Sequence, residues 1–211
     1  FGAAYFPDVE IVHANENQGV TENIVVPPTV AILGAFGLND RIAQPYFAPA
    51  GFSRGRMGDA ISEYTQLNDS NITRLFSARV NPIYSMANSD GPVVFAQKTL
   101  LRAQNALDRI NVRRLLIDVR RKIKEKSRSI LFEQNRASTL AQFSEQCNSV
   151  LAEVQQNQGI DRFKVVIDSS TTTQADIENN TIRGKIFLQP TKSVEFISLD
   201  FVVTNQGAEG L

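Results

Sequence analysis

Apolar residues recur at helical spacing in residues 110–135, which carry the most regular pattern in the chain. Five of these apolar residues are Val112, Leu115, Leu116, Val119 and Ile123. The last four follow Val112 by three, four, seven and eleven positions, and this spacing places all five on one face of a helix. This spacing predicts an amphipathic helix whose apolar face packs against its own domain.

Basic residues occupy the opposite face of this predicted helix. At roughly 100° per residue, Arg114, Arg121 and Arg128 align there, and Lys124 lies beside them. Residues 101–130 hold ten basic and three acidic residues, a net charge of +7, whereas the whole chain has 22 of each. Such a concentration of charge in a neutral chain indicates a local electrostatic contact and not a generally basic nucleic-acid binder. The alternative is a basic face that contacts only solvent.

Two further segments have helical patterns. Residues 139–156 begin with a capping-box pattern, Thr139 with Gln142, and Gly159 follows as a stop signal. Six of their apolar residues lie on one helix face, namely Leu140, Phe143, Cys147, Val150, Leu151 and Val154. Residues 28–42 are apolar on most sides and open with Pro28, a residue favoured in the first turn of a helix. We expect both segments to be helices.

Alternating apolar residues and prolines predict the extended segments, which are residues 1–12, 24–28, 83–86, 92–100, 162–167 and 182–188. Residues 13–23 are polar and predict a loop or turn, and residues 45–58 predict an ordered loop anchored by aromatic side chains. Residues 59–78 predict short helices with a turn at 68–70. The expected fold class is α/β (α+β), with a small mixed sheet flanked by two long helices.

The alternation of apolar residues changes phase near the end of the chain. Val194 and Phe196 share one phase, but the next four apolar residues take the other phase, namely Ile197, Leu199, Phe201 and Val203. A period-two pattern that slips by one residue predicts a bulge, or a strand that changes the surface on which it packs. Residues 205–211 are polar and glycine-bearing, and we expect a mobile tail there.

Few residues in this chain are suited to catalysis. His13 is the only histidine, which excludes a Ser-His-Asp site and a multi-histidine metal site. Cys147 is the only cysteine and falls on an apolar helix face, where it acts as a small buried hydrophobe. An enzyme that uses carboxylates such as Asp168 and Asp176 stays an alternative that no spacing supports. We therefore expect no enzyme, no cofactor and no bound metal.

The longest apolar run, residues 30–38, is too short to span a bilayer, so no membrane insertion is expected.

Several motifs resemble the carboxy-terminal region of contractile phage tail sheath proteins. They are GPVVFAQKTL, LDRINVRRLLIDVRRKI, FEQN, GIDRFKVVID and DIENNTIRGKIFLQPTKSVEFISLDFVV. The earlier segments YFPDVEI, VVPPTVAILGAFGLNDR and APAGFSRGRM resemble the stretch that leads into that region. Together they cover nearly the whole chain in the family's order. Sheath proteins usually carry an amino-terminal arm and outer domains before this point, so we expect the sequence to be part of a longer protein.

The resemblance implies a structural and mechanical role. Sheath subunits form stacked six-membered rings around an inner tail tube, with baseplate and tail terminator proteins at the ends. The sheath then contracts and drives the tube through the host cell envelope. The expected location is the virion, after assembly in the host cytoplasm, although related sheaths operate in injection particles. Contact with nucleic acid is not expected.

The resemblance also implies a division of the chain and two sets of contact residues. Residues 1–58 lead into a tube-facing core at residues 59–204, which ends in a strand arm, and residues 205–211 form the tail. Arg114, Arg121, Lys124 and Arg128 are expected to contact the tube. Ile197, Leu199, Phe201 and Val203 are expected to form a strand exchanged between subunits. A basic-helix nucleic-acid-binding module is the alternative.

Overall fold

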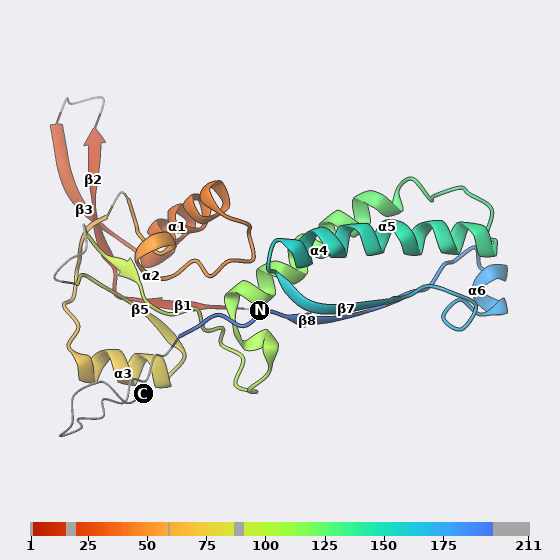
Figure 1. Ribbon diagram of the computed structural model, residues 1–211. Coiled ribbons are helices and arrows are strands. Elements are labelled where there is room, and N and C mark those ends of the chain that lie inside the picture. Colours follow the sequence, from red (N-terminus) through yellow and green to blue (C-terminus); the bar gives the residue numbers. More distant parts are fainter. Residues whose placement is uncertain (1, 16–19, 59, 87–90, 196–211) are drawn as a thin grey trace, which may run out of the picture.

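The computed structural model describes residues 2–15, 20–58, 60–86 and 91–195. Its helices and strands form two lobes that lie side by side (Figure 1). The elements between residues 4 and 94 make the first lobe, and those between residues 106 and 190 make the second. The second lobe is elongated because two long helices run along it (Figure 1).

The first lobe contains two small sheets. In one, β5 (Val80–Tyr84) pairs in parallel with β1 (Ala4–Phe6) and in antiparallel fashion with β6 (Val93–Val94). In the other, β2 (Val9–Asn15) lies between β3 (Val20–Val26) and β4 (Ala60–Glu63), both antiparallel to it. Helices α1 (Pro28–Ile42), α2 (Gly51–Arg54) and α3 (Asp69–Ser77) complete the lobe. One apolar cluster joins these parts, with Val9, Ile32, Ala35, Met57, Ala60, Ile83 and Val94 as its buried members.

The second lobe is built on a pair of long helices. Helices α4 (Ile110–Ser127) and α5 (Ala137–Gln156) lie along one side of an antiparallel pair of strands, β7 (Ile160–Val166) and β8 (Lys185–Pro190) (Figure 1). The short η1 helix (Ala106–Asp108) precedes α4, and α6 (Gln174–Glu178) lies between the two strands. Alternate strand residues pack against the helices, so the core contains Leu115, Val119, Leu151, Val154, Phe163, Val165, Ile186 and Leu188.

The expected fold class is confirmed, because a small sheet and two long helices share one core. Helix α1 has the bounds predicted from the apolar run that follows Pro27. Helix α5 begins at Ala137, two residues earlier than predicted, and the predicted capping box is wrong. The residue that precedes the helix is Arg136, and Thr139 instead donates its hydroxyl hydrogen to the carbonyl of Gln134 at 2.7 Å.

The loop or turn predicted at residues 13–23 is wrong for residues 13–15 and 20–23, which lie in strands, while residues 16–19 lie outside the described residues. Strand β2 continues to Asn15 and β3 begins at Val20, with His13 opposite Glu22 and Val12 opposite Asn23. The two strands form a hairpin that projects from the first lobe, as Figure 1 shows. Polar residues are tolerated on both faces of these strands because both faces meet solvent.

The strand predicted at residues 92–100 is also wrong in extent, since β6 contains only Val93 and Val94. After β6, the buried side chain of Asn81 takes the place of a strand neighbour. It donates to the carbonyl oxygen of Lys98 at 2.8 Å and accepts from the amide of Lys98 at 2.7 Å. A strand ladder is therefore not needed to satisfy that backbone.

The predicted boundary at residue 58 stays a prediction. Met57 and Ala60, which lie on either side of it, belong to the same apolar cluster. The predicted mobile tail at residues 205–211 and the exchanged strand at residues 197–203 lie outside the described residues.

Candidate protein-interaction surface

Helix α4 carries the basic residues that the sequence singled out, and its core-facing side is buried as predicted. Leu115 and Val119 are almost fully buried in the second lobe. The side chain of Asp118 is also buried, although it lies among charged residues of the same helix. The cations of α4 therefore differ in what they contact.

Arg114 contacts the first lobe of its own chain. Its guanidinium forms an ion pair with Asp40 of α1 and lies 4.8 Å from the centre of the Phe36 ring, and its side chain is only 15% exposed. These contacts join α4 to α1, because planar guanidinium groups bind carboxylates and aromatic faces together. Contact of Arg114 with a tube stays a prediction. Such a contact requires the Arg114 guanidinium, which already contacts Asp40 and Phe36 of the same chain.

Arg121, Lys124 and Arg128 lie on the exposed part of the helix and just beyond its last turn. The side chain of Arg121 is 65% exposed and donates to the buried carboxylate of Asp118 at 2.8 Å. This hydrogen bond raises the pKa of Arg121 above its ordinary value. Lys124 and Arg128 are exposed, and neither has an ion pair with another described residue. The structure thus brings three of the four predicted residues to solvent.

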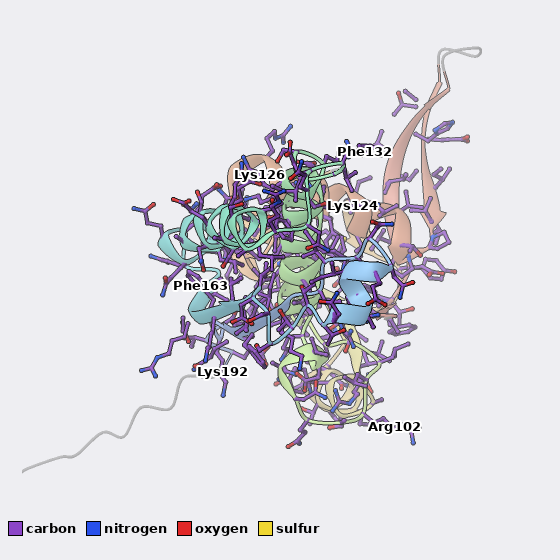
Figure 2. The ribbon with its side chains drawn as sticks, turned by 90° about the vertical axis from the view of Figure 1, so that its right-hand side faces the viewer. Arg102, Lys124, Lys126, Phe132, Phe163 and Lys192 are labelled. Carbon is purple, nitrogen blue, oxygen red and sulfur yellow. The ribbon has the colours of Figure 1, made fainter. Side chains whose placement is uncertain are left out.

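Asp118 lowers the positive charge of the middle of α4. Besides its ion pair with Arg121, Asp118 forms an ion pair with Lys122 at 3.5 Å. Lys122 also forms an ion pair with Glu153 of α5 at 3.2 Å. The nearby hydroxyl of Tyr46 is buried, and burial together with the charges of Asp118 and Glu153 raises the pKa of Tyr46. The exposed cations of α4 and its end that form no ion pair with another described residue are Arg120 in the middle of the helix and Lys124, Lys126 and Arg128 at its carboxy-terminal end (Figure 2 labels both lysines).

A second set of contacts holds the chain after β8, and the sequence analysis missed it. The guanidinium of Arg109 donates twice to the carboxylate of Glu195, at 2.6 and 2.9 Å. Gln97 adds a hydrogen bond to Glu195 at 3.3 Å, and the amide of Asn111 donates to the hydroxyl of Ser193 at 3.2 Å. Residues 193 and 195 are therefore fixed at the amino-terminal end of α4, where a carboxylate is favoured by the helix dipole.

The Arg109–Glu195 pair also perturbs the titration of Arg109. Burial alone lowers the pKa of this guanidinium, but Glu195 and Asp108 outweigh burial, and the pKa is raised. The two partners are 86 residues apart in the sequence, so no local spacing indicates their contact. Ile197, Leu199, Phe201 and Val203, the predicted exchanged strand, follow this pair but lie outside the described residues.

An apolar groove of about 840 Å³ lies between the lobes beside this segment. Aromatic side chains line this groove, and residues 191–195 also line it. These aromatic residues are Tyr46 and Phe47, which pack in the core of the second lobe, and Phe76, Tyr84 and Phe95 of the first lobe. The chain thus leaves its described part at the edge of an apolar surface.

Residues considered for catalysis have structural roles where the structure describes them. Cys147 is fully buried, and burial raises the pKa of its thiol, which disfavours the reactive thiolate. Asp176 is bound by Arg183 and by Thr173, which together lower its pKa to about 2. Asp168 is bound by Ser170, which lowers its pKa. Across the described ranges, no group of three histidine, cysteine or acidic residues is placed to bind a metal ion.

Within the described part of the chain, no helix combines the length and the apolar character needed to cross a membrane.

These features describe a mixed α/β protein in which the carboxy-terminal end of α4 exposes cations and the chain after β8 is held at the amino-terminal end of the same helix. Residues 102–204 match the family described as phage tail sheath C-terminal domain. The chain belongs to this tail sheath family, whose members are structural proteins and not enzymes. The resemblance noted from the sequence motifs is therefore confirmed.

The sequence is similar to those of two tail sheath proteins of phages. It is 32% identical to the tail sheath protein of Vibrio phage KVP40 over 184 residues, which are 87% of this chain and 27% of that protein. It is 31% identical to the tail sheath protein of Enterobacteria phage T4, over 87% of this chain and 28% of that protein. The chain spans about a quarter of the length of these relatives.

The fold is also similar to solved structures of contractile particles. The contracted sheath complex of an extracellular contractile injection system has a TM-score of 0.80 at 24% identity, over 96% of this chain and 56% of that chain. The baseplate of the anti-feeding prophage also gives 0.80, at 22% identity, over 96% of this chain and 54% of the other. At these identities the likeness concerns the fold alone.

Proposed function

We propose that the protein is a subunit of a contractile tail sheath, which polymerises around an inner tail tube and contracts to drive the tube through the host cell envelope. The observation that carries the proposal is the family match of residues 102–204, which include the whole of α4, α5 and both strands of the second lobe. The phage relatives favour a location in the virion, in a tail assembled in the host cytoplasm.

The tube contact is made by the exposed cations at the carboxy-terminal end of α4. Arg121, Lys124 and Arg128 carry positive charge on long side chains, which suits an acidic tube wall. Exposed ion pairs are individually worth about 0–1 kcal/mol, so such contacts form and break without a large barrier. Such contacts suit a sheath that releases its tube on contraction.

The contact between subunits is made by the chain that follows Glu195. Ile197, Leu199, Phe201 and Val203 form a strand that adds to a sheet of a neighbouring subunit in the stacked six-membered rings. Support comes from the apolar alternation of these residues and from the Arg109–Glu195 pair, which fixes the point where the segment begins. The baseplate and a tail terminator protein cap the two ends of the polymer.

Electron microscopy of the full-length purified protein tests the proposal directly. We expect striated tubes, either of sheath alone or around added tail tubes. A protein that stays dispersed at high concentration and in the presence of tubes contradicts the proposed function.

Charge reversal tests the tube contact. Lys124→Glu with Arg128→Glu changes two exposed residues that make no ion pair with another described residue, so the fold is retained. We expect the apparent affinity for preassembled tubes to fall about tenfold, as measured by co-sedimentation. The matched control, Arg74→Glu with Arg102→Glu, makes the same change of charge on exposed residues away from α4 and leaves tube binding unchanged. Equal losses in both double variants contradict the assignment.

A nucleic-acid-binding module is the second candidate, because the same three cations are accessible. Duplex DNA binding by the full-length protein that falls steeply with salt favours that function.

A further inference from the structure

The turn between α4 and α5 exposes two large apolar side chains. The side chain of Phe132 is fully exposed, and that of Leu131 is 62% exposed. Water contact with an aromatic ring is unfavourable, and the ring of Phe132 buries none of its surface within the described chain. The side chain therefore contributes nothing to the core of either lobe.

The backbone of Phe132 also has an unfavourable conformation for this residue. Its φ angle is 71°, in the left-handed region that glycine adopts without cost and that bulky side chains rarely adopt. Glycine would suit the folded chain better at this position. A side chain that opposes folding in two ways, by exposure and by backbone strain, indicates a contact outside the described residues.

The turn holds Phe132 in place on both sides. Ile130 is buried, and its amide donates to the carbonyl of Ser127 at 3.1 Å. The amide of Glu133 donates to the carbonyl of Ile130 at 3.2 Å, and the hydroxyl of Ser129 donates to Gln146 of α5 at 3.3 Å. The aromatic ring is thus presented on an ordered turn, which lowers the entropy lost when it binds.

Exposed cations lie at the same end of the helix pair as Phe132, together with the exposed acidic residues Glu125 and Glu133. Figure 2 looks onto this end of the helix pair and labels Lys124, Lys126 and Phe132 there. Interfaces commonly have an aromatic residue at the centre and charged residues at the rim. The complementary surface is an apolar pocket with an acidic rim.

We propose that Phe132, with Leu131, is the apolar anchor of the tube contact and inserts into an apolar pocket on the acidic wall of the inner tail tube. This inference rests on the proposed function. It assigns the binding strength mainly to the aromatic ring and assigns orientation to Lys124, Lys126 and Arg128.

The test is Phe132→Gly in the full-length protein, measured by co-sedimentation with preassembled tail tubes and by thermal unfolding. We expect a higher Tm, because glycine relieves the strained backbone. We also expect the concentration for half-saturation of the tubes to rise about tenfold. A merely structural role of Phe132 predicts no change in tube binding. Phe132→Leu keeps an apolar side chain and recovers part of the affinity.

Gln158→Gly is the matched control, since Gln158 also has a positive φ, of 61°, but lies at the far end of α5. It raises Tm and leaves tube binding unchanged.

Wild-type affinity of Phe132→Gly for tubes overturns the inference while wild-type sheath tubes still support the proposed function. Loss of sheath polymers without a change in tube binding also overturns it and assigns Phe132 to a neighbouring sheath subunit. If the wild-type protein forms no sheath and binds no tube, the proposed function itself fails.

Discussion

The side-chain amide of Asn81 connects three segments of the first lobe. It donates to the carbonyl of Ala4 in β1 at 3.0 Å, in addition to its two hydrogen bonds with the backbone of Lys98. The side chain is fully buried. Because water cannot replace these hydrogen bonds, the position of residue 98 depends on one amide group.

We expect Asn81→Leu to lower the free energy of unfolding by about 3 kcal/mol, since it leaves buried backbone groups unpaired. Urea denaturation of the wild-type and variant proteins measures the difference. Asn148→Leu on the exposed side of α5 is the control, with a change within about 0.5 kcal/mol. An unchanged urea midpoint for Asn81→Leu contradicts this role.

At the scale of elements, α6 shows how a carboxylate can make a short helix sensitive to pH. Asp176 accepts from the backbone amide of Thr173 at 3.0 Å, while the Thr173 hydroxyl accepts from the amide of Asp176 at 3.3 Å. This capping box satisfies amides that the helix itself leaves unpaired. The nearby guanidinium of Arg183, followed by the bonds to Thr173, holds the pKa of Asp176 at about 2.

The lowered pKa predicts acid sensitivity. The folded state favours the ionised carboxylate, so its stabilising contribution is complete above the ordinary pKa of 3.8 and is lost as the pH falls towards 2. We expect Asp176→Asn to reduce the loss of unfolding free energy between these two pH values. Unfolding measured at a series of pH values checks this, with Glu178→Gln, at an exposed residue, as the control. A variant whose acid transition equals that of the wild type rules out the role of Asp176.

Elements with a strong local pattern were predictable from the sequence. Helix α1 follows from an apolar run that begins after Pro27, and α4 follows from a regular apolar face. The residues at 68–70 predict a turn but begin α3, because the Asn68 side chain accepts from the Asn71 amide at 2.8 Å and caps the helix. Residues that favour turns also favour helix starts, and only the contacts of the following turn distinguish them.

The candidate surface was predictable only in part. Helical periodicity correctly placed Arg121 and Lys124 on the exposed side of α4. It did not predict that Arg114 contacts Asp40, because these residues are 74 positions apart. The exposure of Phe132 was also missed, since the helix ends at Ser127 and periodicity carries no information beyond its end.

At the scale of the whole molecule, the Arg109–Glu195 pair connects the second lobe to the segment that we propose binds a neighbour. We expect Glu195→Gln to lower monomer stability by about 1 kcal/mol or less, since the pair is partly exposed. We expect a clear rise in the protein concentration needed for sheath polymers, because the segment no longer starts in a fixed direction. Turbidity and electron microscopy of the full-length protein measure polymer formation.

The control for this prediction is Glu145→Gln, which removes an exposed carboxylate from α5. It should alter neither stability nor polymer formation. Equal polymer formation by Glu195→Gln and the wild type would show that the pair has no part in assembly.

The position of these contacts on α4 has a mechanical consequence. The helix has 18 residues and a length of about 27 Å, with Arg109 just before its first residue and Arg128 just after its last. In the proposed assembly, a pull on the terminal segment acts at one end of this stiff element, and the proposed tube contact lies at the other end. If these contacts form as we propose, a small tilt of the helix moves Lys124, Arg128 and Phe132 away from the tube together, and stretching between subunits and release of the tube are then a single motion.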